Sequence, residues 1–155
     1  MADEAVEHIW IAAPPERCFE VAVDFEHYPR WATDVKEVEV LARDDEGRGT
    51  KVRFAVAALG RTLGYILNYD YDGAPTEFSW KLAEADVLTV LDGSYRFDPD
   101  PATGGAGTAL TYKLAVDLNL PLPGFVKRRA AGMIIQNAVK GFKRDLEAGA
   151  AGSDA

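Results

Sequence analysis

Four tyrosines are spaced so that their hydroxyls could serve one binding site. Tyr65 and Tyr69 lie four residues apart in one alternating segment, and Tyr95 and Tyr112 lie in two later alternating segments. Since alternate residues of a strand share a face, all four fall on the face that carries the large apolar side chains. A buried phenol needs a hydrogen-bond partner, and four of them make this face more polar than a dry core requires. The pattern favours hydrogen bonding to a ligand held inside the fold.

The same inward face is rich in other aromatic side chains. The expected inward set is Phe54, Tyr65, Tyr69, Phe78, Trp80, Tyr95, Phe97 and Tyr112, with Trp31 at one end. Aromatic walls with a few hydroxyls are typical of pockets for flat or greasy small molecules. The alternative is that these residues fill a core, since any one aromatic taken alone is more often core than ligand wall. The tyrosines as a set favour the pocket.

Residue types that would indicate other chemistry are few. Cys18 stands beside Phe19 in a helical pattern, so we expect a buried, unreactive thiol rather than a nucleophile. The two histidines, His8 and His27, have no companion Cys or His at metal-ligand spacing. The sequence contains no Gly-x-Ser-x-Gly elbow, and its only glycine-rich run lies in a hairpin rather than between a strand and a helix. We therefore expect neither a metal nor a cofactor.

Lys127, Arg128 and Arg129 form a basic run at the start of a segment expected to be helical. Positive charge at that end opposes the helix dipole by roughly 0.3–1 kcal/mol per residue. One interpretation places Arg128 at the mouth of the pocket, where it would meet an acidic group of the ligand. A second pairs it with one of the many acids of the chain. A third makes the run a docking site for an acidic acyl carrier protein.

A sheet and one long helix must position these residues. Residues 4–12 read as a first strand, and residues 14–31 as two short helical segments that begin at a pair of prolines. From residue 36 to residue 118 the apolar pattern has a period of two, broken by turn sequences at 44–47 and 72–75 and a Pro- and Gly-rich loop at 98–107. Sequential hairpins predict an antiparallel sheet that curls as it twists, within an α+β domain.

The last segment, residues 124–148, is expected to be the helix that closes the sheet. Its apolar residues recur at spacings of three and four, which forms one stripe. The stripe consists of Ala131, Ile135, Ala138, Val139, Phe142 and Leu146. Because several of these residues are small, the helix is not expected to fill the whole curve of the sheet. Ile135 and Phe142 are the predicted lid of the pocket.

Composition limits the remaining possibilities. The 155 residues fit one domain, residues 1–148, followed by a tail at 149–155 that has no apolar anchor and is expected to be disordered. A net charge of −8 argues against nucleic acids and against anionic membrane surfaces as partners. The first residues lack a signal-peptide pattern, and no stretch approaches 18 consecutive apolar residues. A single cysteine, which cannot form an internal disulfide, fits a cytoplasmic location.

The chain resembles the START-like, helix-grip superfamily, in the branch called polyketide cyclase/dehydrase and lipid transport. The matching residues are Ala13-Pro14-Pro15-Glu16, Phe19, Asp24, Tyr28-Pro29-Arg30-Trp31, Val38 to Leu41, Gly93-Ser94-Tyr95-Arg96-Phe97, Gly107-Thr108-Ala109-Leu110-Thr111-Tyr112 and the closing helix. The resemblance implies a curved seven-stranded antiparallel sheet that grips a C-terminal helix around a hydrophobic cavity, with two short helices between strands 1 and 2. It also implies a lipid, sterol, quinone or polyketide ligand, and in some members an aromatase/cyclase activity.

Our first hypothesis is a binding protein, with a role in transport as an option, for a hydrophobic small molecule such as a lipid, quinone or polyketide. The predicted ligand-binding residues are Trp31, Phe54, Tyr65, Tyr69, Trp80, Tyr95, Tyr112, Arg128, Ile135 and Phe142. We expect ligand access near the second short helix, beside Trp31.

The second hypothesis is a polyketide aromatase/cyclase or dehydrase that uses tyrosine hydroxyls as acid and enolate partner. Family enzymes often carry an arginine on the fourth strand and a tyrosine after the second short helix, where this chain has Tyr69 and Val35. Asn137 matches an asparagine on their last helix, but a helical wheel places it away from the apolar stripe and hence outside the cavity. An interaction module with a filled core is the third hypothesis, and a homodimer is a further candidate assembly.

Overall fold

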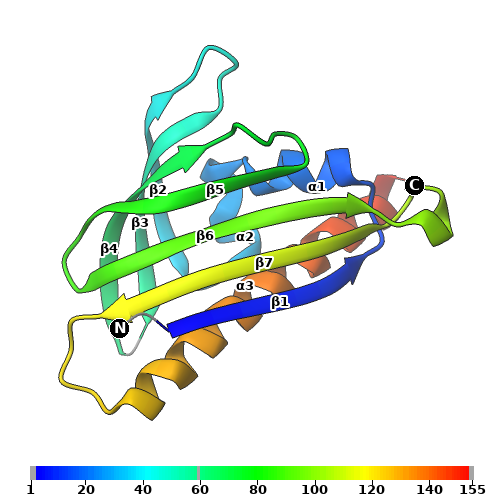
Figure 1. The fold of residues 1–155 in the computed structure, drawn as a ribbon. Helices are drawn as coiled ribbons and strands as arrows, with labels where there is room; N and C mark the ends of the chain where they lie inside the picture. Colours follow the sequence, from blue (N-terminus) through cyan, green and yellow to red (C-terminus); the bar gives the residue numbers. More distant parts are fainter. Residues whose placement is uncertain (1–2, 59, 154–155) are drawn as a thin grey trace.

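The computed structural model describes residues 3–58 and 60–153, and within them one antiparallel sheet of seven strands wraps around a long C-terminal helix (Figure 1). The strands are β1 (Asp3–Ile11), β2 (Val35–Arg43), β3 (Gly49–Ala58), β4 (Arg61–Asp70), β5 (Glu77–Ala85), β6 (Leu88–Pro99) and β7 (Thr108–Leu118). Their order across the sheet is β1-β7-β6-β5-β4-β3-β2. The predicted α+β fold, a curved antiparallel sheet gripping a helix, is confirmed.

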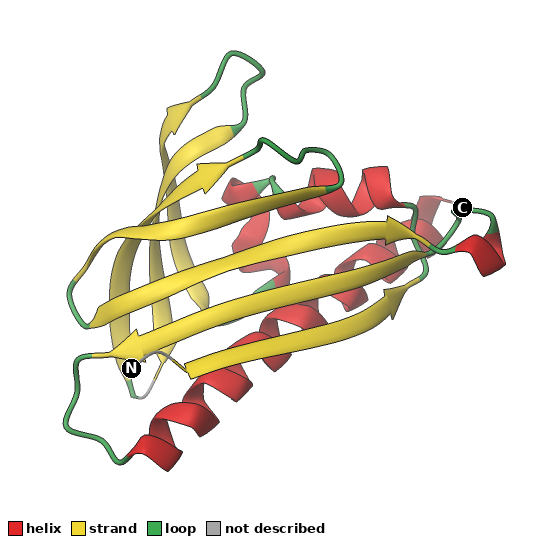
Figure 2. Ribbon diagram, viewed as in Figure 1, coloured by secondary structure: helices red, strands yellow, loops and turns green. Residues whose placement is uncertain are grey.

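Every pair of consecutive strands from β2 to β7 is joined as an antiparallel hairpin, as the alternating pattern predicts. The exception in chain order is β1, which pairs with β7, so that Asp3 lies opposite Val116 and Ile11 opposite Thr108. Register shifts interrupt the pairing of β2 with β3 at three places. Such irregularities increase the local bend and twist of a sheet, and Figure 2 shows the resulting curve around the helix.

Short helical segments fill the connection between β1 and β2. They are α1 (Pro15–Ala22), the 3-10 turn η1 (Phe25–His27) and α2 (Tyr28–Trp31), and a further 3-10 turn, η2 (Pro101–Thr103), lies in the β6–β7 hairpin. Pro15 begins α1, where its missing N–H costs nothing. The thiol of Cys18 is buried beside the hydroxyl of Thr108, at 3.5 Å between Sγ and Oγ1. Burial raises the pKa of Cys18, which keeps the thiol protonated, as expected for a structural cysteine.

The long helix α3 (Gly124–Ser153) packs against β1 and β7. Its apolar stripe is buried at Ala131, Ile135, Val139, Phe142 and Leu146. Gly141 lies where α3 meets α2, since a Cβ at this position would stand 2.2 Å from the carbonyl oxygen of Trp31. Helix α3 is assigned through Ser153, beyond residue 148, and residues 154–155 lie outside the described residues. Disorder of the predicted tail at 149–155 therefore stays a prediction.

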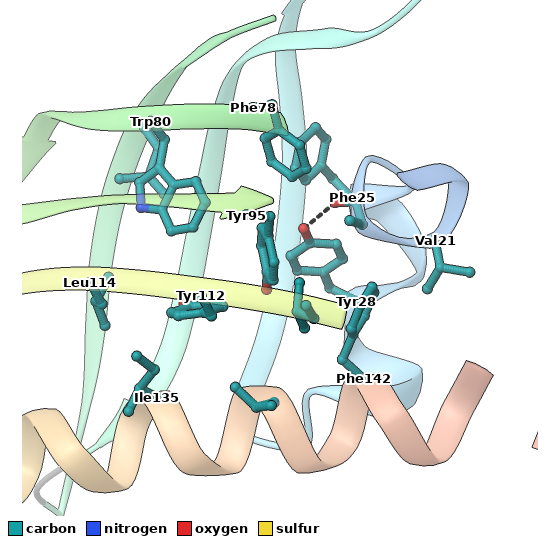
Figure 3. Close-up of a cluster of buried hydrophobic side chains, with 14 of the residues drawn as sticks. Val21, Phe25, Tyr28, Phe78, Trp80, Tyr95, Tyr112, Leu114, Ile135 and Phe142 are labelled. Atoms are coloured by element: carbon teal, nitrogen blue, oxygen red, sulfur yellow. Dashed lines mark hydrogen bonds between the residues drawn. The ribbon is translucent and has the colours of Figure 1, made fainter. Parts of the chain in front are cut away.

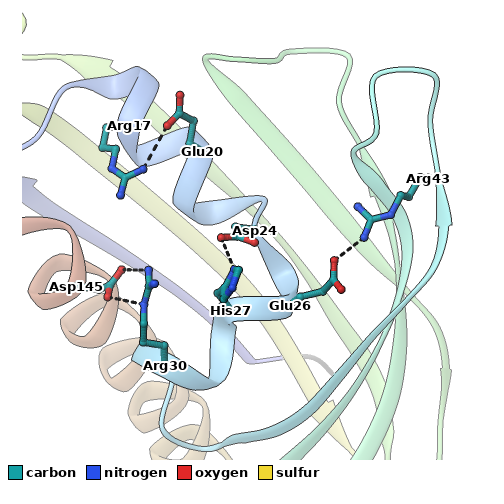
Figure 4. A network of polar contacts seen from close by, with 8 residues as sticks. All are labelled: Arg17, Glu20, Asp24, Glu26, His27, Arg30, Arg43 and Asp145. Atoms are coloured by element: carbon teal, nitrogen blue, oxygen red, sulfur yellow. Dashed lines mark hydrogen bonds and ion pairs between the residues drawn. The ribbon is translucent and has the colours of Figure 1, made fainter. Parts of the chain in front are cut away.

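Ion pairs fasten the short helices to their neighbours on two sides (Figure 4). The guanidinium of Arg30 on α2 makes two 3.1 Å hydrogen bonds to the carboxylate of Asp145 on α3. On the other side, Arg43 of β2 donates to Glu26 of η1 at 2.6 Å. These contacts hold the segment that carries Tyr28 and Trp31 between the helix and the edge of the sheet.

Candidate functional site

A cavity of about 680 Å³ lies between the concave face of the sheet and α3. Aromatic and aliphatic side chains of five neighbouring strands form its wall: Phe54, Tyr65, Leu67, Tyr69, Trp80, Leu91, Tyr95, Tyr112 and Leu114. Alternation along each strand places these side chains on the concave face. Tyr28 and Trp31 from α2 close one end. Figure 3 shows Trp80, Tyr95, Tyr112 and Leu114 on the strands facing Ile135 and Phe142 on the helix.

The structure brings most of the predicted wall together. Trp31, Phe54, Tyr65, Tyr69, Trp80, Tyr95 and Tyr112 all line the cavity. Ring contacts join Phe54 with Tyr65, Tyr69 with Trp80, and Tyr95 with Tyr112. That these residues contact a ligand stays a prediction.

Ile135 and Phe142 do not form the lid that the apolar stripe predicts. They are 1% and 0% exposed, and both lie outside the lining of the cavity. The physical reason is that the strongest apolar stripe of α3 is buried in the core, where Phe142 contacts the rings of Trp31, Tyr95 and Phe97. The two residues therefore belong to the core.

A second face of α3 borders the cavity instead. It consists of Ala130, Met133, Ile134, Asn137 and Ala138, which recur at spacings of three and four and so share one side of the helix. The expectation that Asn137 lies outside the cavity is wrong. The helical wheel gives only the angle between Asn137 and the apolar stripe of α3. The sheet curves away from the helix beside that stripe, so the neighbouring face of α3 stays uncovered and borders the cavity.

Arg128 is exposed and is not part of the cavity lining. Neither Arg128 nor its neighbours Lys127 and Arg129 forms an ion pair with any residue that the structure describes. The structure thus places Arg128 neither in the lining of the cavity nor in an ion pair with a described acidic residue, which were the first two predicted settings. The third setting, contact with an acidic partner, stays a prediction.

The mouth of the cavity is polar and lies beside the α2–β2 connection, where ligand access is predicted. Its exposed lining residues are Thr33, Asp34, Gly60, Arg61, Thr62, Met133 and Asn137. The amide of Asn137 donates to the Asp34 carboxylate at 3.4 Å, which joins α3 to that connection across the rim. Thr33 and Asp34 were missed from the sequence because they stand in the connection between α2 and β2, outside any periodic pattern. Tyr28 was also missed, although its three-residue spacing to Trp31 was a usable signal.

The tyrosines of the wall are neutral phenols. Burial raises the pKa of each of the five lining tyrosines: Tyr28, Tyr65, Tyr69, Tyr95 and Tyr112. The neighbouring phenol of Tyr112 raises the pKa of Tyr95 further. The Tyr28 hydroxyl donates to the carbonyl of Ala22, as the dashed line in Figure 3 marks. A phenol in this state can donate or accept a hydrogen bond, but it cannot act as a phenolate base at neutral pH.

Few other groups in the lining carry a charge. Among the described residues that line the cavity, Asp34 and Arg61 are the charged side chains, and both stand at the exposed rim. Histidine, cysteine and glutamate are absent from that same lining. Nowhere in the described part of the chain do three or more His, Cys, Asp or Glu side chains come together as metal ligands. The interior is suited to hold an uncharged molecule by ring contacts and a few hydroxyls.

The sequence matches a protein family described as "Polyketide cyclase / dehydrase and lipid transport" over residues 3–149. No curated protein sequence matches significantly. No helix within the described residues is long and apolar enough to cross a membrane.

Solved structures with the same fold are numerous. A START superfamily protein from Mycobacterium smegmatis is 26% identical, with a TM-score of 0.85 over 93% of this chain and 97% of the other. A protein from Thermus thermophilus is 24% identical, with a TM-score of 0.76 over 94% and 98% of the two chains. An aromatase/cyclase from Streptomyces sp. R1128 is 17% identical, with a TM-score of 0.77 over 97% and 94%.

Proposed function

The chain belongs to the polyketide cyclase / dehydrase and lipid transport family, and from this membership we propose that its cavity binds a hydrophobic small molecule. The observation that carries the proposal is the aromatic-lined cavity of about 680 Å³ between the sheet and α3. This volume lies in the range of roughly 300–1,000 Å³ that is typical of small-molecule sites. Lipids, quinones and polyketides are the ligand classes that fit such an interior.

Binding, with transport as one outcome, is favoured over catalysis because the interior lining, within the described residues, lacks a general base. Proton removal beside a carbonyl requires a group that is basic near neutral pH. The lining tyrosines stay protonated, because burial raises their pKa values. Asp34, the carboxylate in the lining, is at the rim and accepts a hydrogen bond from Asn137. The cavity is better equipped to hold a ligand than to ionise one.

The proposal is tested by filling the cavity from the helix side. Replacing Ala138 with Phe adds a ring on the lining face of α3 and should lower the affinity for a bound lipophilic dye at least about tenfold. Ala148→Phe is the matched control, because Ala148 is exposed on the same helix away from the lining. Dye titration of both variants checks the prediction, together with native mass spectrometry of freshly purified protein for a co-purified lipophile. Equal dye affinities in the wild type and both variants would contradict it.

A second candidate function is a polyketide aromatase/cyclase or dehydrase. It is favoured by the neighbouring phenols of Tyr95 and Tyr112, whose ring centroids lie 4.6 Å apart, because a phenol that keeps its proton can donate it to a developing enolate oxygen. Turnover of a poly-β-ketone substrate by the wild type, reduced in Tyr69→Phe, would support this function. No turnover together with saturable binding of a lipophile would exclude it.

Partners and location complete the proposal. The basic run at Lys127, Arg128 and Arg129, in which both arginines are exposed, is proposed to dock an acidic acyl carrier protein that delivers the ligand. Replacing all three by Gln should weaken that complex and remove its salt dependence, measured by calorimetry with a purified carrier protein.

A homodimer and a cytoplasmic location are also proposed. Sedimentation velocity tests the homodimer, and localisation of a tagged chain tests the cytoplasmic location.

A further inference from the structure

The indole nitrogen of Trp31 is a buried donor without an acceptor. Within residues 3–58 and 60–153, its Nε1 atom has no hydrogen-bond partner, and the side chain is 3% exposed. An indole N–H can only donate. Burying such a donor unpaired disfavours a conformation by about 5- to 150-fold relative to one in which water reaches it. Since nearly all buried polar groups of folded proteins are paired, this exception indicates a residue that is not always enclosed.

The segment that carries Trp31 is short and is held in place by contacts with other elements. Helix α2 is a single turn, too short to be stable by itself, and Pro29 within it has no backbone N–H to donate. In the described part of the chain, two side-chain contacts join this segment to α3. They are the bidentate contact of Arg30 with Asp145 and the 3.4 Å hydrogen bond from Asn137 to Asp34. Arg30, Asn137 and Asp34 are exposed, so water competes for both contacts.

The same segment forms one side of the cavity mouth. Residues 31–34 line the cavity, and Asn137 of α3 meets Asp34 across the rim. Behind the rim, the ring of Trp31 packs on Phe142 of α3 with 5.2 Å between centroids. Movement of the segment away from α3 would therefore break both side-chain contacts, widen the mouth and bring the indole N–H into contact with water.

We propose that residues 28–34 are a lid over the cavity mouth, which opens by moving away from α3 and exposes Trp31 as it does so. The structure shows the lid closed. Burial of the Trp31 ring and the two contacts to α3 favour the closed position, whereas the unpaired N–H favours the open one, which leaves the open position accessible as a minor population. The role of the lid in ligand entry rests on the proposed binding function, but its motion can be measured without a ligand.

Exchange of the Trp31 indole proton with D2O, followed by NMR, measures opening, because water reaches this proton in the open position. Opening is restricted in the double variant Arg30→Cys/Asp145→Cys by joining the two thiols with a short bismaleimide. Both positions lie outside the cavity lining, and the natural Cys18 is buried. We expect the cross-link to slow exchange of the indole proton at least about tenfold relative to the same variant capped with N-ethylmaleimide.

The matched control is Arg17→Cys/Glu20→Cys, which replaces an ion pair whose two residues both belong to α1. A cross-link between these positions lies within one helix and does not join α2 to α3. It should therefore leave exchange of the Trp31 indole proton unchanged.

The same proteins test whether the lid controls ligand entry. In stopped-flow mixing with the lipophilic dye, the cross-link between α2 and α3 should slow association and dissociation by a similar factor of at least about tenfold, so that the equilibrium affinity changes little. Incorporating 3-benzothienylalanine at position 31 keeps the shape of the ring but removes the N–H. The closed position then contains no unpaired donor, so association should slow about fivefold or more.

Indole exchange that is equally fast in the cross-linked and capped proteins would overturn the lid. So would dye rates that do not respond to the cross-link, or association that the benzothienyl analogue leaves unchanged or accelerates. In these cases a measurable dye affinity leaves the proposed binding function standing. A wild type that does not bind the dye would overturn the binding function, and the indole exchange alone would then decide on the lid.

If the double cysteine variant does not fold, Arg30→Gln tests the lid from the opposite direction, because it removes one contact of the closed position. Both indole exchange and dye association should then become faster than in the wild type. Equal rates in Arg30→Gln and the wild type would overturn the proposal.

Discussion

Two glycines of α3 show how a single missing side chain decides a contact. At Gly141 a Cβ would stand 2.2 Å from the backbone oxygen of Trp31, so α3 approaches α2 through this position. At Gly132 a Cβ would meet nothing within 4 Å. The same substitution is therefore expected to act in opposite directions, because alanine is favoured over glycine in a helix by about 1 kcal/mol wherever space allows.

We predict that Gly141→Ala lowers the free energy of unfolding by about 1–3 kcal/mol, the usual cost of forcing extra volume into a packed contact. Gly132→Ala should raise it by up to about 1 kcal/mol. Urea unfolding followed by circular dichroism measures both. A Gly141→Ala protein as stable as the wild type would show that α2 and α3 do not depend on this close approach.

The bidentate contact between Arg30 and Asp145 makes a prediction at the scale of the element α2. Arg30→Gln should cost no more than about 1 kcal/mol in global stability, since the arginine side chain is 55% exposed. Because the pair joins α2 to α3, amide hydrogen exchange in residues 28–32 should nevertheless become faster. Arg17→Gln is the matched control, as Arg17 pairs with Glu20 within α1. Equal exchange in both variants would mean that the pair does not anchor α2.

The elements themselves were predictable from the sequence, and their boundaries follow from strong local signals. Alternation from β2 to β7 and the long amphipathic pattern of α3 are features that each segment carries by itself. The wall residues of the cavity were predictable for the same reason. Alternation along a strand alone places Tyr65, Tyr69 and Tyr95 on the same face of the sheet, independently of the rest of the chain.

The helix side of the cavity was not predictable in this way. Which face of α3 borders the cavity depends on where the curved sheet departs from the helix, and that is set by the pairing of β1 with β7 and by the bends in β2. A hydrophobic stripe marks what is most deeply buried, so it indicated Ile135 and Phe142, which are core. Asn137 and Arg61 reach the cavity through tertiary geometry alone.

For the molecule as a whole, the buried tyrosines predict sensitivity to alkaline pH. Burial holds the pKa values of the five lining tyrosines above their ordinary value near 10, which the unfolded chain regains. Below about pH 10 these groups therefore leave the free energy of unfolding unchanged. Above about pH 10 the unfolded state releases protons first, so the folded state becomes less stable relative to it. We expect the free energy of unfolding to fall above about pH 10 by more than about 1.4 kcal/mol per pH unit, the limit for a single group.

Urea unfolding between pH 8 and pH 11.5 measures this slope, and absorbance at 295 nm reports tyrosinate directly. Tyrosine ionisation should coincide with unfolding rather than precede it. Ionisation of most tyrosines in the folded protein near pH 10 would contradict the enclosed interior.

The pairing of β1 with β7 also has a consequence for how the protein is made. A ribosome synthesises Asp3 well before its neighbour Val116, so β1 stays without its partner strand until β7 has emerged. The α3 segment, which rests on these two strands, follows later still. The hairpins from β2 to β6 can form as they emerge, whereas the cavity is enclosed only after β1 has paired with β7 and α3 has packed against both strands.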